Sequence, residues 1–195
     1  RGVPVQMTPK VSGRWRWIGT QTLVFETKPR LPNATMFTLT IPRGVTSMRG
    51  MKLEKEVRFS FQTPPPRVIG QGPINGPQRT DATMFLHFDQ AVDLEEVARR
   101  VVVKSQGQRY AIKPTKEIRD VMGKAVRLDL SSTQQRRFFK FKTVEPLPRD
   151  ASVMVRLEKG VPSLEGPRKT TETSKFQFQT YGPFKVVRQH ENRGC

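Results

Sequence analysis

The segment Phe59-Ser60-Phe61-Gln62-Thr63 returns as Phe176-Gln177-Phe178-Gln179-Thr180 near the end of the sequence. In both segments two phenylalanines stand two residues apart, and alternate side chains of an extended strand lie on the same face of a sheet. Each segment therefore predicts a strand with one aromatic, inward face. A motif that returns in this way is also typical of a repeated module.

Two further blocks lie before each of these segments at matching distances. The first pair is Leu23-x-Phe25-x-Thr27-x3-Leu31-Pro32 and Phe139-x-Phe141-x-Thr143-x3-Leu147-Pro148. The second pair is Gly44-Val45-x-Ser47-x-x-Gly50 and Gly160-Val161-x-Ser163-x-x-Gly166. The offset is 116 residues for these blocks and 117 residues for the Phe-x-Phe segments. Agreement over three separated blocks indicates two copies of one module.

The segments around the blocks predict short strands connected by turns. Apolar alternation and β-branched residues predict strands over 36–41, 84–88, 101–104, 110–113, 126–130 and 153–157. One helical turn is predicted over 93–98, with Asp93 as its N-cap and Glu96 at the capping-box position. Short strands with glycine and proline turns are typical of an antiparallel sandwich. We therefore predict an all-β fold of two tandem immunoglobulin-like antiparallel β-sandwich domains.

The run Pro64-Pro65-Pro66 separates the two copies, because three consecutive prolines favour a stiff polyproline II spacer. We predict a first module in residues 1–66, a second in 67–182, and a linker into a further domain or a tail in 183–195. By the 116-residue offset, Arg1 corresponds to Glu117. The first module is therefore expected to be N-terminally incomplete, without counterparts of about residues 69–116, and open to self-association.

The composition is strongly basic. Lys and Arg total 35 against 17 Asp and Glu, so the formal net charge is +18 over 195 residues. Such a surplus attracts anionic polymers, weakly and without selectivity, through counterion release. One cysteine, Cys195, and two histidines exclude a disulfide framework and a zinc site with the usual four ligands. No cofactor and no metal are expected.

The sequence resembles the macroglobulin-type, immunoglobulin-like domains in the N-terminal half of bacterial alpha-2-macroglobulins. The resemblance covers about residues 3–187. In the first copy it rests on Gly13-Arg14-Trp15-Arg16-Trp17, Thr22-Leu23-Val24-Phe25, Leu31-Pro32-x-Ala34-Thr35, Ile41-Pro42-x-Gly44-Val45, Gly50-x-x-Leu53 and Phe59-x-Phe61-Gln62-Thr63-x-x-Pro66. In the second copy it includes Phe88-Asp89-Gln90-Ala91-Val92, which is similar to a strand end of that family.

This resemblance implies a role and a compartment. The family comprises large protease traps outside the cytoplasm, often periplasmic lipoproteins in bacteria. A protease cuts a bait region, the molecule rearranges, and a thioester between a Cys and a Gln can bind the protease covalently. The thioester needs a Cys-x-Glu-Gln type motif, and Cys195 is followed by no such residues; no bait region is recognisable either.

The resemblance therefore implies a non-catalytic structural or interaction fragment of an endopeptidase inhibitor, periplasmic or at the cell surface. Such a fragment contacts neighbouring domains of its own chain and meets target proteases only through the intact protein. Two other functions stay open. One is a bacterial immunoglobulin-like surface or adhesin tandem, and the other is a basic module that binds lipopolysaccharide, polysaccharide or nucleic acid.

Two groups of residues are candidates for an interaction surface. Trp15 and Trp17 share one face of a predicted strand, where they form either core packing or an exposed aromatic platform. The second group interleaves with phenylalanines like a platform for single-stranded nucleic acid, and consists of Arg136, Arg137, Lys140 and Lys142. Strand alternation gives a plainer explanation, in which Lys140 and Lys142 face solvent while Phe139 and Phe141 face the core.

No catalytic constellation is recognisable. His87 lies on an apolar strand and is expected to be a surface or boundary residue. Serine, histidine and aspartate occur, but no spacing joins them as a nucleophile and its base. Glu95 and Glu96 are better explained by the helix N-terminus than by acid–base chemistry. We therefore predict that the chain is not an enzyme.

Overall fold

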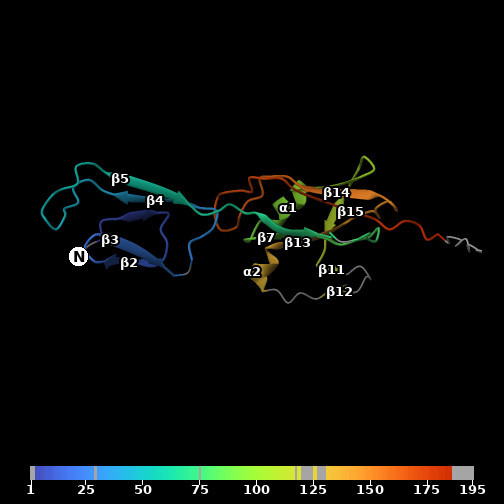
Figure 1. The fold of residues 1–195 in the computed structure, drawn as a ribbon, viewed down its shortest axis with the longest axis horizontal. Helices are drawn as coiled ribbons and strands as arrows, with labels where there is room; N and C mark the ends of the chain where they lie inside the picture. The colour runs from blue at the N-terminus through green and yellow to red at the C-terminus, as the bar shows by residue number, and fades with distance from the viewer. Residues whose placement is uncertain are drawn as a thin grey trace, which may run out of the picture.

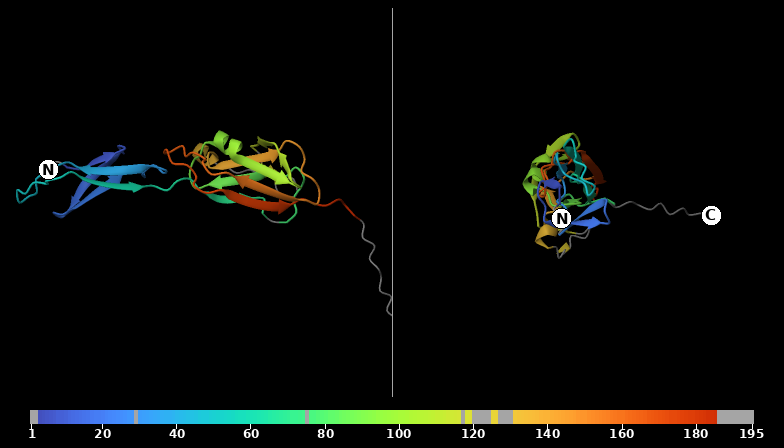
Figure 2. Two further views of the ribbon diagram at one scale, coloured as in Figure 1. Left: turned by 90° about the horizontal axis from the view of Figure 1, so that it is seen from above. Right: turned by 90° about the vertical axis from the view of Figure 1, so that its left-hand side faces the viewer.

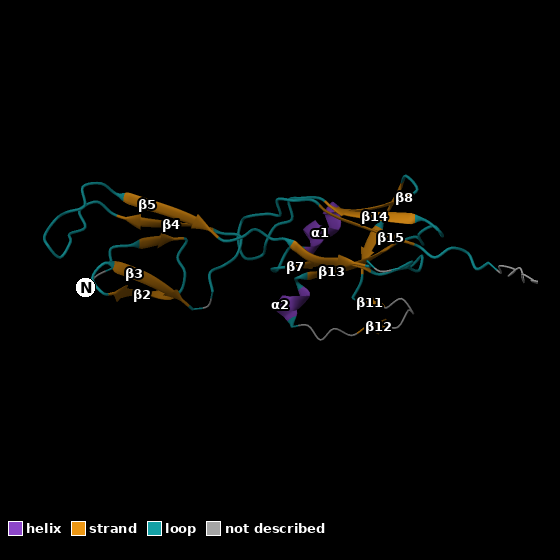
Figure 3. Cartoon of the chain, viewed as in Figure 1, coloured by secondary structure: helices purple, strands orange, loops and turns teal. Residues whose placement is uncertain are grey.

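The computed structural model describes residues 3–28, 30–74, 76–116, 118–119, 125–126 and 131–185. Within these residues the chain forms fifteen β-strands and two short helices (Figures 1 and 3). The first five strands are β1 (Gln6–Thr8), β2 (Gly13–Ile18), β3 (Thr22–Thr27), β4 (Met36–Ile41) and β5 (Val57–Gln62). The elements that follow are β6 (Val68–Gly72), β7 (Met84–Phe88), α1 (Leu94–Arg100), β8 (Val101–Ser105), β9 (Gln108–Tyr110), β10 (Ile112–Pro114), β11 (Ile118–Arg119), β12 (Ala125–Val126), α2 (Ser132–Gln135), β13 (Phe138–Thr143), β14 (Ser152–Leu157) and β15 (Ser174–Gln179).

The strands fall into two groups that do not share a sheet in the described part of the chain. Strands β1 to β5 pair among themselves, and so do β6 to β15. All these pairs are antiparallel. We call residues 3–63 the N-terminal unit and residues 67–181 the C-terminal unit; they lie end to end along the long axis (Figures 1 and 2). The prediction of an all-β, sandwich-like fold is confirmed.

The C-terminal unit places two four-stranded sheets face to face. One sheet has the order β10-β13-β7-β6 and the other has the order β15-β14-β8-β9. The strands alternate between buried apolar and more exposed residues, which is the pattern of a sheet with one face on a core. In β13, Phe139 and Phe141 are buried, whereas Lys140 and Lys142 are half-exposed. The core is continuous and includes Met84, Leu86, Phe88, Val97, Val103, Phe139, Phe141, Val153, Val155 and Phe178.

The N-terminal unit repeats part of this arrangement with fewer strands. It contains a three-stranded sheet of order β1-β4-β5 and the hairpin β2-β3. Strands β3, β4 and β5 correspond by the sequence offset to β13, β14 and β15. The registers also agree, because Leu39 is opposite Phe59 in one unit and Val155 is opposite Phe176 in the other. The sequence repeat is therefore a repeat of structure for these three strands.

Two strand positions of the N-terminal unit are filled in a way that the offset does not predict. In the C-terminal unit the amide of Val144 donates to the carbonyl of Ala111 at 2.8 Å, which joins β13 to β10. The equivalent amide of Lys28 donates to the carbonyl of Ser12 at 3.2 Å, so β2 occupies the place of β10. Strand β1 lies on the side of β4 opposite β5, which is the place that β8 takes beside β14. The expectation that all strands before the equivalent of Glu117 are missing is therefore wrong for these two positions.

Local predictions are borne out for most strands, two need correction, and one lies mostly outside the described residues. The segment 110–113 is not one strand, because β9 ends at Tyr110 and β10 begins at Ile112. The helical turn extends to Arg100, and Asp93 is its N-cap, but the Glu96 carboxylate binds Arg99 and Arg100 instead of closing a capping box. Most of the predicted strand 126–130 lies outside the described residues.

Candidate functional site: the junction between the two units

The N-terminal unit ends in a hydrogen-bonded corner. The Thr63 hydroxyl donates to the carbonyl of Pro32 at 2.7 Å and accepts from the amide of Thr35 at 3.0 Å. Ala34 adopts a left-handed conformation with φ of 55°, and its amide donates to the carbonyl of Pro64 at 2.9 Å. The Leu-Pro break after β3 and the threonine after β5 are thus fixed together at the end of the unit that faces the C-terminal unit.

The C-terminal unit presents a loop of residues 160–170 to this corner. Its base is closed by the Thr170 hydroxyl, which accepts from the amides of Gly160 and Val161 at 2.9 and 3.0 Å. Near its tip the Ser163 hydroxyl donates to the side-chain carbonyl of the buried Gln90 at 2.8 Å. The Ser163 hydroxyl also accepts from the amide of Glu165 at 3.0 Å, which holds the acidic residue in place.

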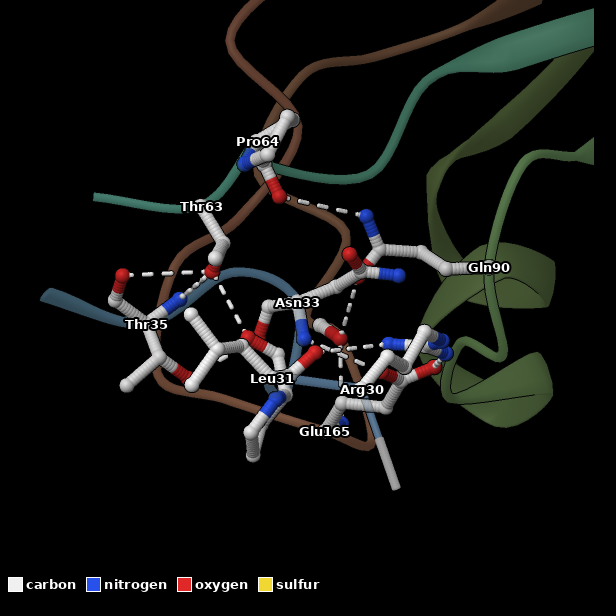
Figure 4. A network of polar contacts seen from close by, with 10 residues as sticks. Arg30, Leu31, Asn33, Thr35, Thr63, Pro64, Gln90 and Glu165 are labelled. Atoms are coloured by element: carbon white, nitrogen blue, oxygen red, sulfur yellow. Dashed lines mark hydrogen bonds and ion pairs between the residues drawn. The ribbon is translucent and has the colours of Figure 1, made fainter. Parts of the chain in front are cut away.

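An ion pair joins the two units (Figure 4). The Arg30 guanidinium donates two hydrogen bonds of 2.8 Å to the two carboxylate oxygens of Glu165. The amide of Asn33 donates to the same carboxylate at 3.0 Å. Bidentate pairs of this geometry are stronger and more directional than single contacts. The Glu165 side chain is only 20% exposed, so solvent screens this pair less than a typical surface pair.

Three further hydrogen bonds use backbone carbonyls of the corner as acceptors. The Arg168 guanidinium donates to the carbonyl of Thr63 at 2.6 Å, and the Arg168 amide donates to the carbonyl of Ala34 at 3.0 Å. The Gln90 side-chain amide donates to the carbonyl of Pro64 at 3.3 Å. Because a backbone carbonyl is positioned by the fold, such bonds fix the relative orientation of the units more narrowly than contacts between two flexible side chains.

Gly166 allows the closest approach across the junction. A Cβ atom at this position would lie 2.3 Å from the Thr35 hydroxyl and 2.5 and 2.6 Å from the carbonyl oxygens of Ala34 and Asn33. These distances are far below van der Waals contact, and two of the neighbours are backbone atoms. Glycine is therefore required here by close packing of the two units.

The charges at the junction stabilise one another. The pKa of Glu165 lies below its usual value of 4.5, chiefly because Arg30 donates hydrogen bonds to the carboxylate. Burial opposes this shift, while the amide of Asn33 and the positive charges of Arg30 and Arg137 add to it. The pKa of Arg30 is raised by the same pair. Both groups are thus charged at neutral pH.

The structure separates the two predicted tryptophans. Trp15 is half-buried, and its ring centroid lies 4.7 Å from that of Phe25 on the neighbouring strand. Trp17, opposite Leu23, is 40% exposed. On the other face of the hairpin Arg14 and Arg16 bind Glu26. One tryptophan thus packs on the N-terminal unit while the other reaches solvent.

The predicted basic residues lie along β13 and just before it. Arg136 is exposed, and Arg137, Lys140 and Lys142 are half-buried. Lys140 lines a groove of about 930 Å³ between α1 and β13, together with Arg99 and Lys116. The phenylalanines Phe139 and Phe141 point into the core, so they are not available for stacking with bases. Phe138 also lines the groove, but its ring stacks on His87, so the arrangement provides positive charge without a row of free aromatic rings.

The remaining candidate residue within the described ranges, His87, packs against an aromatic ring. His87 stacks on Phe138 with ring centroids 3.9 Å apart, and its pKa is lowered by burial and then by the charge of Arg137. Within the described ranges no group of three or more His, Cys, Asp or Glu residues could hold a metal ion. No described helix is long and apolar enough to cross a membrane. His190 and Cys195 lie outside the described residues.

Comparisons with known proteins give one sequence relative and one structural neighbour of note. No family model matches the sequence. In an alignment of 163 positions that covers 80% of the chain, it is 28% identical to the circularly permutated Ras protein 2 of Dictyostelium discoideum, but the alignment covers 4% of that protein. The N-terminal part of the bacterial S-layer protein SbsC shares 16% sequence identity, with a TM-score of 0.37 over 59% of this chain and 24% of that one. Neither match assigns a function to the chain.

Sequence reasoning did not find the junction. It placed Gly166 in a repeated block and interpreted the proline run as a spacer, and it passed over Arg30, Glu165 and Arg168. A usable signal was present, because the offset aligns Gly166 with Gly50 and thereby marks the tip of the same loop in both copies. Contact between that loop and the preceding unit depends on how the units are placed in space, which the repeat alone does not define.

Proposed function

We propose that this chain is a non-catalytic structural segment of an extracytoplasmic protein of the alpha-2-macroglobulin type, in which immunoglobulin-like β-sandwich domains are held in series. The observation that carries the proposal is the junction. The loop of residues 160–170 docks on the N-terminal unit through the Arg30–Glu165 ion pair, two bonds from Arg168 to backbone carbonyls and the close approach of Gly166, and Gln90 adds a third bond to a backbone carbonyl. A segment of this kind positions its neighbours, because its two units have a defined relative orientation.

The repeat supports a series longer than two. The N-terminal unit carries an equivalent loop at residues 44–53, closed by Gly44 donating to Leu53 at 2.9 Å. Met48 and Met51 on this loop are 71% and 68% exposed. At the other end of the chain the corner is also repeated, because the Thr180 hydroxyl donates to Pro148 at 2.6 Å. The described residues thus repeat the loop in the N-terminal unit and the corner in the C-terminal unit, as a head-to-tail string of such units requires.

The protease-trapping role and the periplasmic or cell-surface location come from the sequence resemblance and belong to the intact protein. A protease assay tests the part assigned to this chain. Incubation with a model serine protease should give no adduct on denaturing gels and no lasting loss of protease activity. A stable adduct through any residue of this chain would overturn the structural role.

The coding sequence beyond residue 195 separates the trap from an adhesin tandem. A downstream Cys-x-Glu-Gln motif supports the trap, whereas cell-wall anchoring or further immunoglobulin-like repeats alone support the adhesin.

Binding of an anionic polymer is a second candidate, favoured by the groove beside Lys140 and the net charge of +18. Whether the binding is selective for one polymer decides between a dedicated binding function and a general property of a basic surface. A weak, unselective interaction that salt removes is the expected behaviour of a basic surface.

A further inference from the structure

Strand β3 of the N-terminal unit has a partner strand on one edge only among the described residues. In the C-terminal unit β13 is paired on both edges, with β10 on one side and β7 on the other. In the N-terminal unit the equivalent strand β3 pairs with β2, which takes the place of β10. Among the described residues no strand pairs with the opposite edge of β3.

The free edge has defined donors and acceptors. In an antiparallel pair, successive residues alternate between hydrogen-bonding to the partner and pointing their backbone groups away. Because Lys28 bonds to Ser12, the residues of β3 that point away from β2 are Leu23, Phe25 and Thr27. Their equivalents in β13 face β7, where Phe139 is opposite Leu86 and Phe141 is opposite Met84.

The inward side chains beside this edge are less buried than their equivalents. Phe139 and Phe141 are 3% and 0% exposed, whereas Leu23 and Phe25 are half-buried. The exposed fraction is larger still on the facing sheet β1-β4-β5, where the Phe59 side chain of β5 is 62% exposed.

The equivalent of Phe59, Phe176, packs against the core beside β6, whose Gln71 bonds to the hydroxyl of Ser174 and the carbonyl of Lys175. The uncovered apolar surface therefore lies where β6 and β7 would lie.

We propose that the free edge of β3 binds an antiparallel β-strand from a separate polypeptide segment with large apolar residues at alternating positions. The C-terminal unit shows the form of the occupant, since Met84, Leu86 and Phe88 of β7 are all buried at the matching place. The bound strand places one apolar side chain opposite Leu23 and another opposite Phe25. Main-chain hydrogen bonds supply affinity and the inward side chains supply selectivity, which is the usual division in strand addition.

A peptide with the sequence of residues 82–90, extended by lysines for solubility, tests this proposal on the whole chain. Hydrogen exchange read by NMR should show at least about tenfold more protection at Leu23, Phe25 and Thr27 when the peptide is added. A peptide of the same composition with the apolar positions shifted by one residue should give no protection, because a one-residue slip turns its side chains to the wrong face. Protection by both peptides, or by neither, would contradict the proposal.

Substitution of an exposed residue supplies a second measurement. Phe59→Ser should weaken peptide binding by about tenfold or more, since its equivalent Phe176 packs against the core that includes Met84, Leu86 and Phe88 of β7. Met48→Ser changes a similarly exposed apolar residue on the 44–53 loop and should leave peptide affinity unchanged. Circular dichroism confirms that both variants fold. Equal affinities for the two variants would overturn the assignment, and so would protection of Leu23, Phe25 and Thr27 that rises with protein concentration alone, because that result assigns the edge to a second copy of the chain.

Discussion

Thr63 and Thr180, 117 residues apart in the sequence, make the same three hydrogen bonds in the two units. Each hydroxyl donates to the carbonyl after the Leu-Pro break, at Pro32 in one unit and Pro148 in the other. Each hydroxyl also accepts a 3.0 Å hydrogen bond from a backbone amide, that of Thr35 in one unit and that of Ala151 in the other. The third hydrogen bond runs from each hydroxyl to the carbonyl of the same residue, at 3.2 and 3.3 Å. A threonine thus locks the last strand of each unit to its corner.

Loss of either hydroxyl should destabilise only the unit to which it belongs. Thr180→Val leaves the buried amide of Ala151 without this acceptor, so we expect the free energy of unfolding of the C-terminal unit to fall by about 1 to 3 kcal/mol. The chain has two tryptophans, Trp15 and Trp17, both in the N-terminal unit. Tryptophan fluorescence in urea therefore reports that unit, while far-UV circular dichroism reports both.

For Thr180→Val we expect the dichroism transition to move while the fluorescence transition stays, and for Thr63→Val the fluorescence transition should move. Thr180→Ser keeps the hydroxyl and is the matched control. Equal shifts of both signals in Thr180→Val would contradict separate unit-by-unit locking.

Substitution of Gly166 should loosen the junction. Gly166→Ala introduces a Cβ at 2.3 Å from the Thr35 hydroxyl, so the loop has to withdraw from the corner. We expect the two units to tumble more independently, with a shorter rotational correlation time for each unit in NMR relaxation and a broader size distribution in X-ray scattering. The stability of either unit should change little, because the contact lies between them.

Gly182→Ala is the control for this experiment. A Cβ at position 182 would meet Asp150 at 3.7 Å, which is ordinary contact. If Gly166→Ala and Gly182→Ala tumble alike, the close approach of Gly166 does not set the orientation of the units.

The ion pair of Glu165 predicts a pH dependence of the docked arrangement. Its pKa is below 4.5 when docked, because Arg30 hydrogen-bonds to the carboxylate. A carboxyl with a lowered pKa stabilises the docked form above its ordinary pKa, and that stabilisation is lost as the pH falls through the lowered value. We therefore expect NMR correlation times to be constant from pH 8 to about pH 5 and to decrease below about pH 4.5.

Glu165→Gln should remove most of this pH dependence and give shorter correlation times at neutral pH. Glu26→Gln is the matched control, since the pKa of Glu26 is also lowered, by Arg16 and Arg14, but within the β2–β3 hairpin and not across the junction. A junction that keeps its pH response in Glu165→Gln depends on some other group.

The strand pattern was predictable from the sequence because it depends on local chemistry. Met36–Ile41 is predicted at its exact bounds, since β-branched and aromatic residues alternate there between two turn signals. The repeat also predicts the matching turn conformations, with φ of 86° at Gly44 and 99° at Gly160. These features depend on residues that are close in sequence.

Features that depend on distant residues were missed for a physical reason. The register of β2 with β3 is set by a short local hairpin, so β2 can occupy the place of β10 although the two segments do not correspond in the repeat. Likewise, Arg30 and Glu165 are 135 residues apart and carry no motif. Single charged residues of this kind are indistinguishable from solvated surface until the fold brings them together.

Polyanion binding should be weak and governed by salt. Lys140 and Lys142 are half-buried beside an inward aromatic row, so they offer charge without base stacking. In a heparin or DNA binding assay, we expect affinity to fall steeply between about 50 and 200 mM salt, with no preference for sequence. Lys140→Gln should reduce the affinity uniformly for all polyanions. Sequence-selective binding at the higher salt concentration would instead support a dedicated polymer site.

The N-terminal unit should open more readily than the C-terminal unit. In β4 only Phe37 is fully buried, whereas in the equivalent β14 Val153, Val155 and Leu157 are 0 to 2% exposed. Protection from hydrogen exchange follows the free energy of opening, and buried apolar contact is its main source. We expect amides of residues 36–41 to exchange at least about tenfold faster than those of residues 152–157 in the dilute chain. The comparison is matched, because the two strands have the same register with their partners β5 and β15. Equal protection in both strands, unchanged by dilution, would show that the N-terminal unit is closed by its own five strands and has no need of an added one.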